Sequence, residues 1–234
     1  MSLNLRPDRA VLANVPLFRG LTEAEQDAVL AQAQTRRVPK GGTAFDEGAA
    51  ATALFVLVSG RMKAVKTTPD GQQALVHFID PSDFFGCVAL MGYPTYPATA
   101  VAVTESVVLS WDIAALKQLM ATCPQIAANA LPSLGDRLRD AHTQFLELST
   151  EQVERRVAHA LLRLVRHAGK KVEAGVEIDF PVTRQEIAEM IGTTLHSVSR
   201  VLSAWESQGI LEGGRQRIVV KKPHALVAIA EELG

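Results

Sequence analysis

The segment from Pro181 to Glu206 constrains the fold of this chain more than any other. It places Thr183 three residues before Glu186, which is the spacing of a capping box and marks the start of a short helix. Gly192 permits a tight turn, and Thr194 is placed to cap a second helix. We therefore predict two short helices that cross at a glycine turn.

The second predicted helix has two distinct faces. Its apolar face carries Val198, Val201, Leu202 and Trp205, and its outer face carries His196, Ser199, Arg200 and Ser203. This arrangement after a short helix and a turn is typical of a helix-turn-helix, whose second helix enters the major groove of DNA. The alternative is a helical hairpin that serves only packing, with Arg200 on a solvated face.

The outer face supplies candidate DNA contacts. Because an arginine can bind guanine O6 and N7 with two hydrogen bonds, Arg200 is predicted to read a guanine, with Ser199 and His196 beside it. Side chains at helix N-termini and on a wing are placed for phosphate oxygens. The predicted phosphate contacts are Thr183, Arg184, Gln185, Thr194, Ser197, Arg215 and Arg217.

A wing is predicted after the second helix. Residues 209–212 should form one strand, Gly213 and Gly214 the hairpin turn, and residues 217–221 the return strand. A further helix is expected over residues 151–168, ended by Gly169.

A long helix is predicted ahead of that region, and Pro132 should start or kink it locally. Apolar residues recur in it at spacings of three and four, as in the seam of a coiled coil. Two interpretations remain open, because the seam can pack on a second copy of the chain or on the helix's own domain. The seam residues are Leu131, Leu134, Leu138, Ala141, Phe145 and Leu148.

The first half of the chain has a different pattern. Short apolar or alternating runs, punctuated by Gly, Pro and Asp, predict an antiparallel barrel or roll. The expected strands are 53–59, 62–67, 74–79, 98–103 and 106–111, and Asp112 is a candidate cap for the helix that follows. The expected fold class is α+β, with a β-roll sensor over residues 1–123, a dimerisation helix over 124–149 and a winged helix-turn-helix over 150–234.

Composition and missing motifs exclude several classes of function. No run approaches about 18 apolar residues and no signal peptide is visible, so we expect a cytoplasmic protein with no membrane partner. The motifs of hydrolase nucleophiles, phosphate loops, zinc proteases and dinucleotide sites are absent, so we expect no enzyme. Residues 150–234 hold twelve Lys and Arg against eleven Asp and Glu. Binding to DNA would therefore rely on a few placed cations.

Motifs from both halves resemble the Crp/Fnr superfamily of bacterial transcription regulators. The resemblance implies a cyclic-nucleotide-binding-like roll, a homodimer through the long helix, and binding to palindromic double-stranded DNA with TTG-type half-sites. It implies Arg200 as the guanine reader with Ser199 beside it, although many members have Glu where this chain has His196. RNA polymerase is an expected partner. The matching stretches begin at Pro16 (PLFRGLT), Leu54 (LFVLVSGR), Gly71 (GQQ), Pro81 (PSDFFG) and Val182 (VTRQEIAEMIG), and include the later SVSRVL.

The sensor residues depart from the cyclic-AMP-binding members. Those members need a Gly-Glu pair and an Arg followed by Ser or Thr, whereas this chain has Gly86-Cys87 and no arginine within residues 96–100. Since a buried phosphate without its cation costs several kcal/mol, cyclic AMP is disfavoured. An iron–sulfur cluster is not expected, because the N-terminal cysteine cluster of the oxygen-sensing members is absent and Cys87 and Cys123 are the only cysteines.

Residues 96–100 (YPATA) and 193–200 (TTLHSVSR) resemble most the nitric-oxide-responsive Nnr and Dnr regulators of denitrification genes. In that branch haem is the suspected sensor, which implies an axial ligand. Each candidate could instead be structural. A Crp/Fnr regulator with another small ligand or none, and a module that acts through protein contacts, stay open. The candidate haem or ligand residues are His77, Cys87, Met91, Tyr96 and His142.

Overall fold

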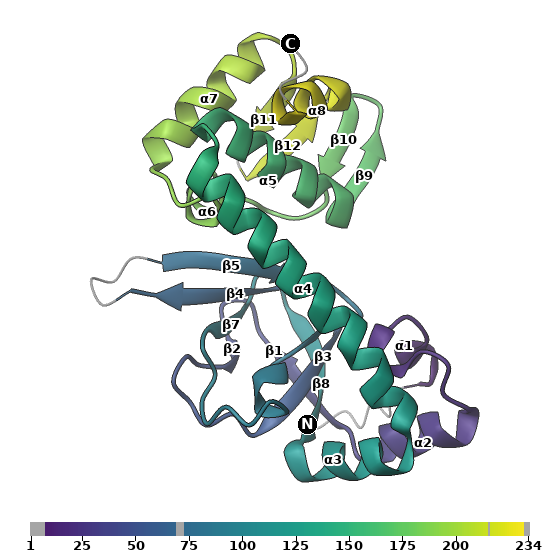
Figure 1. Ribbon diagram of the computed structural model, residues 1–234. Coiled ribbons are helices and arrows are strands. Elements are labelled where there is room, and N and C mark those ends of the chain that lie inside the picture. The colour runs from purple at the N-terminus through teal and green to yellow at the C-terminus, as the bar shows by residue number, and fades with distance from the viewer. Residues whose placement is uncertain (1–7, 69–72, 215, 232–234) are drawn as a thin grey trace. The chain divides into compact units, whose positions relative to one another are not determined.

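The computed structural model describes residues 8–68, 73–214 and 216–231 of the 234-residue chain (Figure 1). The chain forms two compact units, and the division falls between Arg139 and Asp140, inside the long helix α4 (Pro124–Thr150). No described helix is long and apolar enough to cross a membrane.

The first unit is built on two four-stranded antiparallel sheets, with strand orders β1-β8-β3-β6 and β2-β7-β4-β5. The strands are β1 (Gln34–Val38), β2 (Thr43–Phe45), β3 (Ala53–Ser59), β4 (Met62–Thr67), β5 (Gln73–Ile79), β6 (Phe84–Phe85), β7 (Thr99–Ala102) and β8 (Ser106–Asp112). The helices are α1 (Ala10–Ala13), η1 (Pro16–Phe18), α2 (Glu23–Ala31), η2 (Cys87–Ala89) and α3 (Ile113–Thr122), followed by the first part of α4.

The central strand β3 is buried on both faces because its side chains alternate between two cores. Leu54 and Val56 pack with Trp111 and the flanking helices. Phe55 and Leu57 instead face the interior between the two sheets. This two-residue period is what a strand covered on both sides requires.

The predicted β-roll is confirmed. The structure also contains β1, β2 and β6, which the sequence did not predict. Four of the five β1 residues are exposed, so this strand has no apolar alternation to reveal it, and β6 has only two residues. The Asp112 cap is confirmed, since Oδ1 of Asp112 accepts a hydrogen bond from the Ala115 amide at 2.8 Å.

The second unit combines helices with a four-stranded sheet of order β11-β12-β10-β9. Its helices pack around α5, whose inner face is formed by Val157, Leu161 and Leu164. The elements are α5 (Val153–Ala168), β9 (Gly169–Val172), β10 (Gly175–Ile178), α6 (Arg184–Met190), α7 (Leu195–Ser207), β11 (Leu211–Gly214), β12 (Arg217–Val220) and α8 (Pro223–Glu231), together with the last turns of α4.

The wing differs in detail from the prediction. Gly213 and Gly214 were predicted as its turn, but both belong to β11, and Gly214 pairs with Arg217. The turn therefore falls after Gly214, and Gln216 has a positive φ of 60°. Two glycines next to each other favour a turn by propensity, but strand pairing decides which residues stay in the ladder.

The helix α4 also corrects an expectation. Pro132 was expected to start or kink this helix; α4 begins at Pro124, so Pro132 does not start it but lies inside it. The missing N–H of Pro132 leaves the carbonyl of Ala128 without its usual partner. Since Ala128 is exposed, water can bind that carbonyl.

Replacing Leu54 with Ala should destabilise the first unit by about 2–5 kcal/mol, because Leu54 is fully buried and its removal leaves a cavity. Urea unfolding followed by tryptophan fluorescence measures this, since Trp111 lies in the same core. The control is Val76→Ala, at a residue that is 46% exposed and should change stability by less than about 0.5 kcal/mol. Equal effects of the two variants would contradict this account of the core.

Candidate nucleic-acid interface

The α6–turn–α7 motif forms as its sequence predicts. The hydroxyl of Thr183 accepts a hydrogen bond from the Glu186 amide at 3.1 Å, and Glu186 Oε2 accepts one from the Thr183 amide at 2.9 Å. Gly192 has a φ of 59° in the turn, which favours glycine. Thr194 caps α7 by accepting a hydrogen bond from the Ser197 amide at 3.2 Å.

The two faces of α7 are divided largely as predicted. Val198, Leu202 and Trp205 are buried, with at most 2% of each residue exposed, whereas Val201, which was predicted on the same face, is half-buried. His196 and Arg200 are exposed and Ser199 is half-buried. The N-terminal half of α7 therefore presents polar side chains to solvent, as a recognition helix does.

The three arginines predicted to bind DNA and described by the structure differ in their contacts. Arg200 is exposed and makes no hydrogen bond or ion pair with another described residue. Arg184 instead lies 2.8 Å from Glu206 Oε1 and also donates to Ser203 Oγ at 3.1 Å. In the unbound chain, Arg184 thus ties α6 to α7.

Arg217 is also held by carboxylates. Its guanidinium lies 2.9 Å from Glu177 Oε1 and 3.2 Å from Glu212 Oε1. The Arg217 guanidinium lowers the pKa of Glu177, so this pair persists at neutral pH and is lost only when acid protonates the carboxylate. A phosphate contact by Arg217 would have to replace these partners.

The other predicted phosphate-contact residues are placed at helix starts, but no structural observation tests their contact with DNA. Thr183 and Thr194 hold the N-caps of α6 and α7. Ser197 shares a hydrogen bond with Thr194, and Gln185 is exposed and donates to Glu189 Oε1 at 3.0 Å. Arg215 lies outside the described residues.

Sequence reasoning missed the carboxylates that face these cations. Glu206 lies on the same helix as Arg200, yet it turns toward Arg184 on α6. Glu177 belongs to the β9–β10 hairpin, which the sequence did not predict, and it is brought to Arg217 because β10 pairs with β12. Only the strand order could have shown that second contact.

An exposed apolar stripe runs along α4. Leu131, Leu138 and Phe145 are each more than 65% exposed, and Leu148 is 50% exposed. Leu134 is half-buried and Ala141 is exposed. Large apolar side chains in a regular line on a helix are typical of a surface that pairs with another helix.

The interior of the β-roll is filled by aromatic side chains. Phe45 and Tyr96 stack with ring centroids 3.8 Å apart, and Phe55 and Phe85 stack at 5.4 Å. Tyr96 is 3% exposed, and its hydroxyl donates to the Ala53 carbonyl at 2.8 Å and accepts from the Ala53 amide at 3.0 Å. These two hydrogen bonds hold Tyr96, which follows the Gly86–Cys87 pair in the sequence, against the backbone of β3.

The structure places the candidate haem ligands in different surroundings. An axial ligand needs a free donor atom inside an apolar pocket. Tyr96 is inside the roll but its hydroxyl is occupied, whereas Met91 is 56% exposed and Cys87 is half-buried. His142 is exposed on α4 in the second unit. His77 is exposed on β5, although desolvation and then the Arg137 cation lower its pKa to about 4.

Comparison with known proteins agrees with this geometry. Residues 35–123 match the family model of the cyclic nucleotide-binding domain, and residues 155–229 match that of the Crp-like helix-turn-helix domain. The chain is 32% identical over 215 residues to the cyclic AMP receptor protein of Thermus thermophilus, covering 92% of this chain and 96% of the relative. It is 29% identical over 199 residues to the CRP-like cAMP-activated global transcriptional regulator of Mycobacterium tuberculosis, covering 85% and 89%.

A solved structure supports the same assignment. FixK2 from Bradyrhizobium japonicum superimposes with a TM-score of 0.74 at 27% identity, covering 84% of this chain and 96% of FixK2. The expected roll, long helix and C-terminal helix-turn-helix are therefore confirmed. The chain belongs to the Crp/Fnr family of transcription regulators and is not an enzyme.

Proposed function

We propose that this chain is a homodimer that binds inverted-repeat double-stranded DNA, with α7 of each subunit in the major groove. The observation that carries the proposal is the exposed N-terminal half of α7, where Arg200 is exposed and has no partner among the described residues. An arginine in this position can meet guanine O6 and N7 at once. His196 and Ser199 lie beside it and are assigned to the neighbouring bases.

The stripe on α4 is the proposed dimer interface. Its six side chains, from Leu131 to Leu148, keep the spacing of a coiled-coil seam and most of them are exposed. Pairing two copies along this seam buries them. A twofold dimer then presents two recognition helices, which fits half-sites about one helical turn apart.

The proposed signal is a small ligand other than cyclic AMP. Two relatives carry cyclic AMP in their names, but this chain has Cys87 after Gly86 and no arginine within residues 96–100. Tyr96 and its hydrogen bonds instead occupy the interior of the roll there. The response to nitric oxide and the control of denitrification genes rest only on the resemblance of residues 96–100 and 193–200, and they stay a prediction.

Haem also stays a prediction, because it rests on the same resemblance. We also propose that the protein works in the cytoplasm and contacts RNA polymerase at the promoters that it regulates. The alternative is a regulatory module that acts through protein contacts. DNA binding by the wild-type protein that is lost in Arg200 variants would favour the DNA-binding regulator over a module that acts through protein contacts.

Arg200→Ala should weaken operator binding by about 1–3 kcal/mol, or roughly 5- to 150-fold, and relax the preference for one base in each half-site. Fluorescence anisotropy on duplexes selected from a random pool by the wild-type protein measures both effects. Arg166→Ala is the control, because Arg166 is an exposed arginine in the last turn of α5 and not on α7. Unchanged affinity and base preference in the Arg200 variant would contradict the proposed role of α7 in reading DNA.

Leu138→Asp should dissociate the dimer, because the seam would bury an unpaired carboxylate. A cost of about 3 kcal/mol corresponds to a dissociation constant roughly a hundredfold higher, which sedimentation velocity can measure. Leu146→Asp is the control, since Leu146 is also an exposed α4 leucine, 47% exposed, but lies off the seam. If the two variants gave the same mass, the seam would not be the interface.

Titration with cyclic AMP, followed by calorimetry, should show no saturable binding, because the phosphate would lack its cation. Saturable binding at micromolar concentrations would contradict the assignment of the roll.

In a parallel anaerobic titration with haem, a Soret band that saturates at one haem per subunit and shifts with nitric oxide would support the haem prediction. His77 and His142 would then be the first residues to mutate.

A further inference from the structure

Glu147 is a buried charged residue on the helix that carries the proposed dimer seam. It lies between the seam residues Phe145 and Leu148 in sequence, yet only 7% of its surface is exposed, against 66% and 50% for those two. Among the described residues, Ser106 is the other polar residue buried to this degree. A buried carboxylate has to be paired, so its partners show what holds this end of α4.

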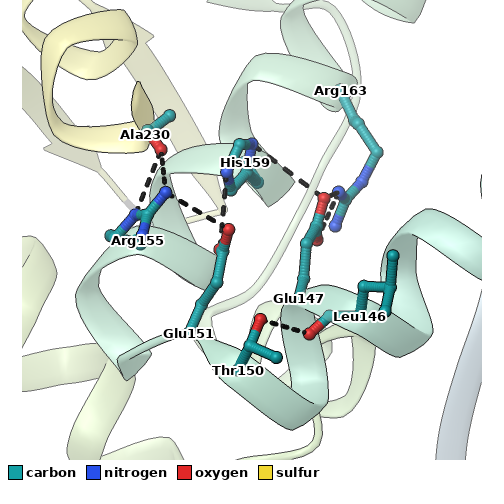
Figure 2. Close-up of polar contacts among 8 residues, drawn as sticks. All are labelled: Leu146, Glu147, Thr150, Glu151, Arg155, His159, Arg163 and Ala230. Carbon is teal, nitrogen blue, oxygen red and sulfur yellow. Dashed lines mark hydrogen bonds and ion pairs between the residues drawn. The ribbon is translucent and has the colours of Figure 1, made fainter. Parts of the chain in front are cut away.

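The partner of Glu147 comes from α5. Nη1 of Arg163 lies 2.8 and 2.7 Å from the two carboxylate oxygens, and Nδ1 of His159 lies 3.9 Å from Oε1 (Figure 2). In the sequence, His159 and Arg163 follow Glu147 by 12 and 16 positions, respectively. The last turns of α4 are thus joined to α5 by an ion pair that is mostly shielded from water.

The contacts continue across α5 to the C-terminal helix. Nε2 of His159 lies 3.4 Å from Glu151, and Glu151 lies 3.4 Å from Arg155 (Figure 2). Arg155 donates to the Ala230 carbonyl at 2.9 and 3.1 Å. One polar network therefore spans α4, the residues that link it to α5, α5 itself and α8.

The same α5 holds the recognition helix. Nε1 of Trp205, on α7, donates to Glu154 at 3.1 Å, and Arg156 donates to the Ile191 carbonyl at the end of α6 at 2.9 Å. The methyl groups of Leu148 lie about 3.5 Å from where a Cβ on Gly192 would be. The α4 segment thus reaches the helix-turn-helix both through α5 and directly.

Apolar packing alone does not set the angle between α4 and this motif. An open groove of about 210 Å³ runs between them, and Glu147 and Arg163 themselves help to line it, together with Ala141, Phe145, Leu148, Arg156, Met190 and Ile191. A helix contact bordered by an open groove can repack at several angles. A buried ion pair cannot, because a shift that separates its charges leaves each of them desolvated and unpaired.

We propose that Glu147 is a positioning residue that fixes the angle between the dimer seam and the recognition helix, and so determines which half-site spacing the dimer accepts. The inference rests on the proposed function, since spacing has meaning only for a DNA-binding dimer. Desolvation offsets much of the attraction in a buried ion pair, so the main effect of this pair is on geometry and not on stability.

The test replaces the pair with apolar residues of similar volume, in the double variant Glu147→Leu with Arg163→Met. This variant leaves no unpaired charge and is expected to fold. Full-length protein is titrated onto inverted repeats whose half-sites are those selected by the wild type, with the spacer shortened or lengthened by one base pair. We expect the wild type to lose about tenfold or more in affinity at the wrong spacings, and the double variant less than about threefold.

A second variant and a matched control accompany the double variant. Glu147→Gln keeps the shape of the side chain but removes its charge, and it should show the same loss of discrimination to a smaller degree. Asp136→Asn makes the same chemical change on α4 at a residue paired with Arg139, where both side chains are at least 65% exposed. That control should keep the spacing preference of the wild type.

The outcomes separate this inference from the proposed function. If both Glu147 variants remain dimeric and keep the wild-type spacing preference, or if the wild type accepts every spacing equally, Glu147 has no positioning role. A wild-type protein that is monomeric, or that selects no inverted repeat, overturns the proposed function itself. Unchanged base preference within each half-site, together with altered spacing, is the result expected of a positioning residue.

Discussion

Burial of one face of α7 against its neighbours, which include α6, α5 and β11, is the interaction on which the C-terminal unit depends. Val198, Leu202 and Trp205 are buried on that face, so the opposite face cannot turn inward. The burial of a tryptophan and two aliphatic side chains contributes several kcal/mol. This fixed orientation, more than any single polar contact, presents Arg200 to solvent in the N-terminal half of the helix.

In the C-terminal unit, arginines are paired with carboxylates, and no large excess of positive charge builds up. Arg184 and Arg217 are each held by carboxylates in the unbound chain, while Arg200 has no described partner. A nearly neutral domain has no strong general attraction for the DNA backbone. In the proposed DNA-binding dimer, specific base contacts and the correct presentation of two half-sites would therefore supply more of the selectivity, which makes the rigidity around Glu147 consequential.

The first unit is organised around β3, which contributes to a helix-covered core on one face and to the interior of the roll on the other. The roll interior is occupied by stacked aromatic side chains, and Tyr96 is bonded to the β3 backbone. A ligand that enters there must displace these rings or bind beside them. The interior of the roll thus presents aromatic side chains, and residues 96–100 contain no arginine.

The sequence by itself determined the elements whose signals are local. The caps at Thr183 and Thr194, the turn at Gly192 and the faces of α7 follow from spacing over a few residues, as do the apolar strands of the roll and the seam of α4. These features depend on backbone propensity and on periodic burial, which a short stretch of sequence already contains.

Tertiary structure alone decided the contacts between residues far apart in sequence. The polar strand β1 forms because β8 offers it a ladder, and the wing turn moves past Gly214 because β11 continues to pair with β12. Glu147 meets Arg163 and Glu177 meets Arg217 only after helices and strands have packed. Pairing and packing energies depend on partners that no local pattern names, and for that reason the sequence predicted the recognition helix but not the network that holds it in place.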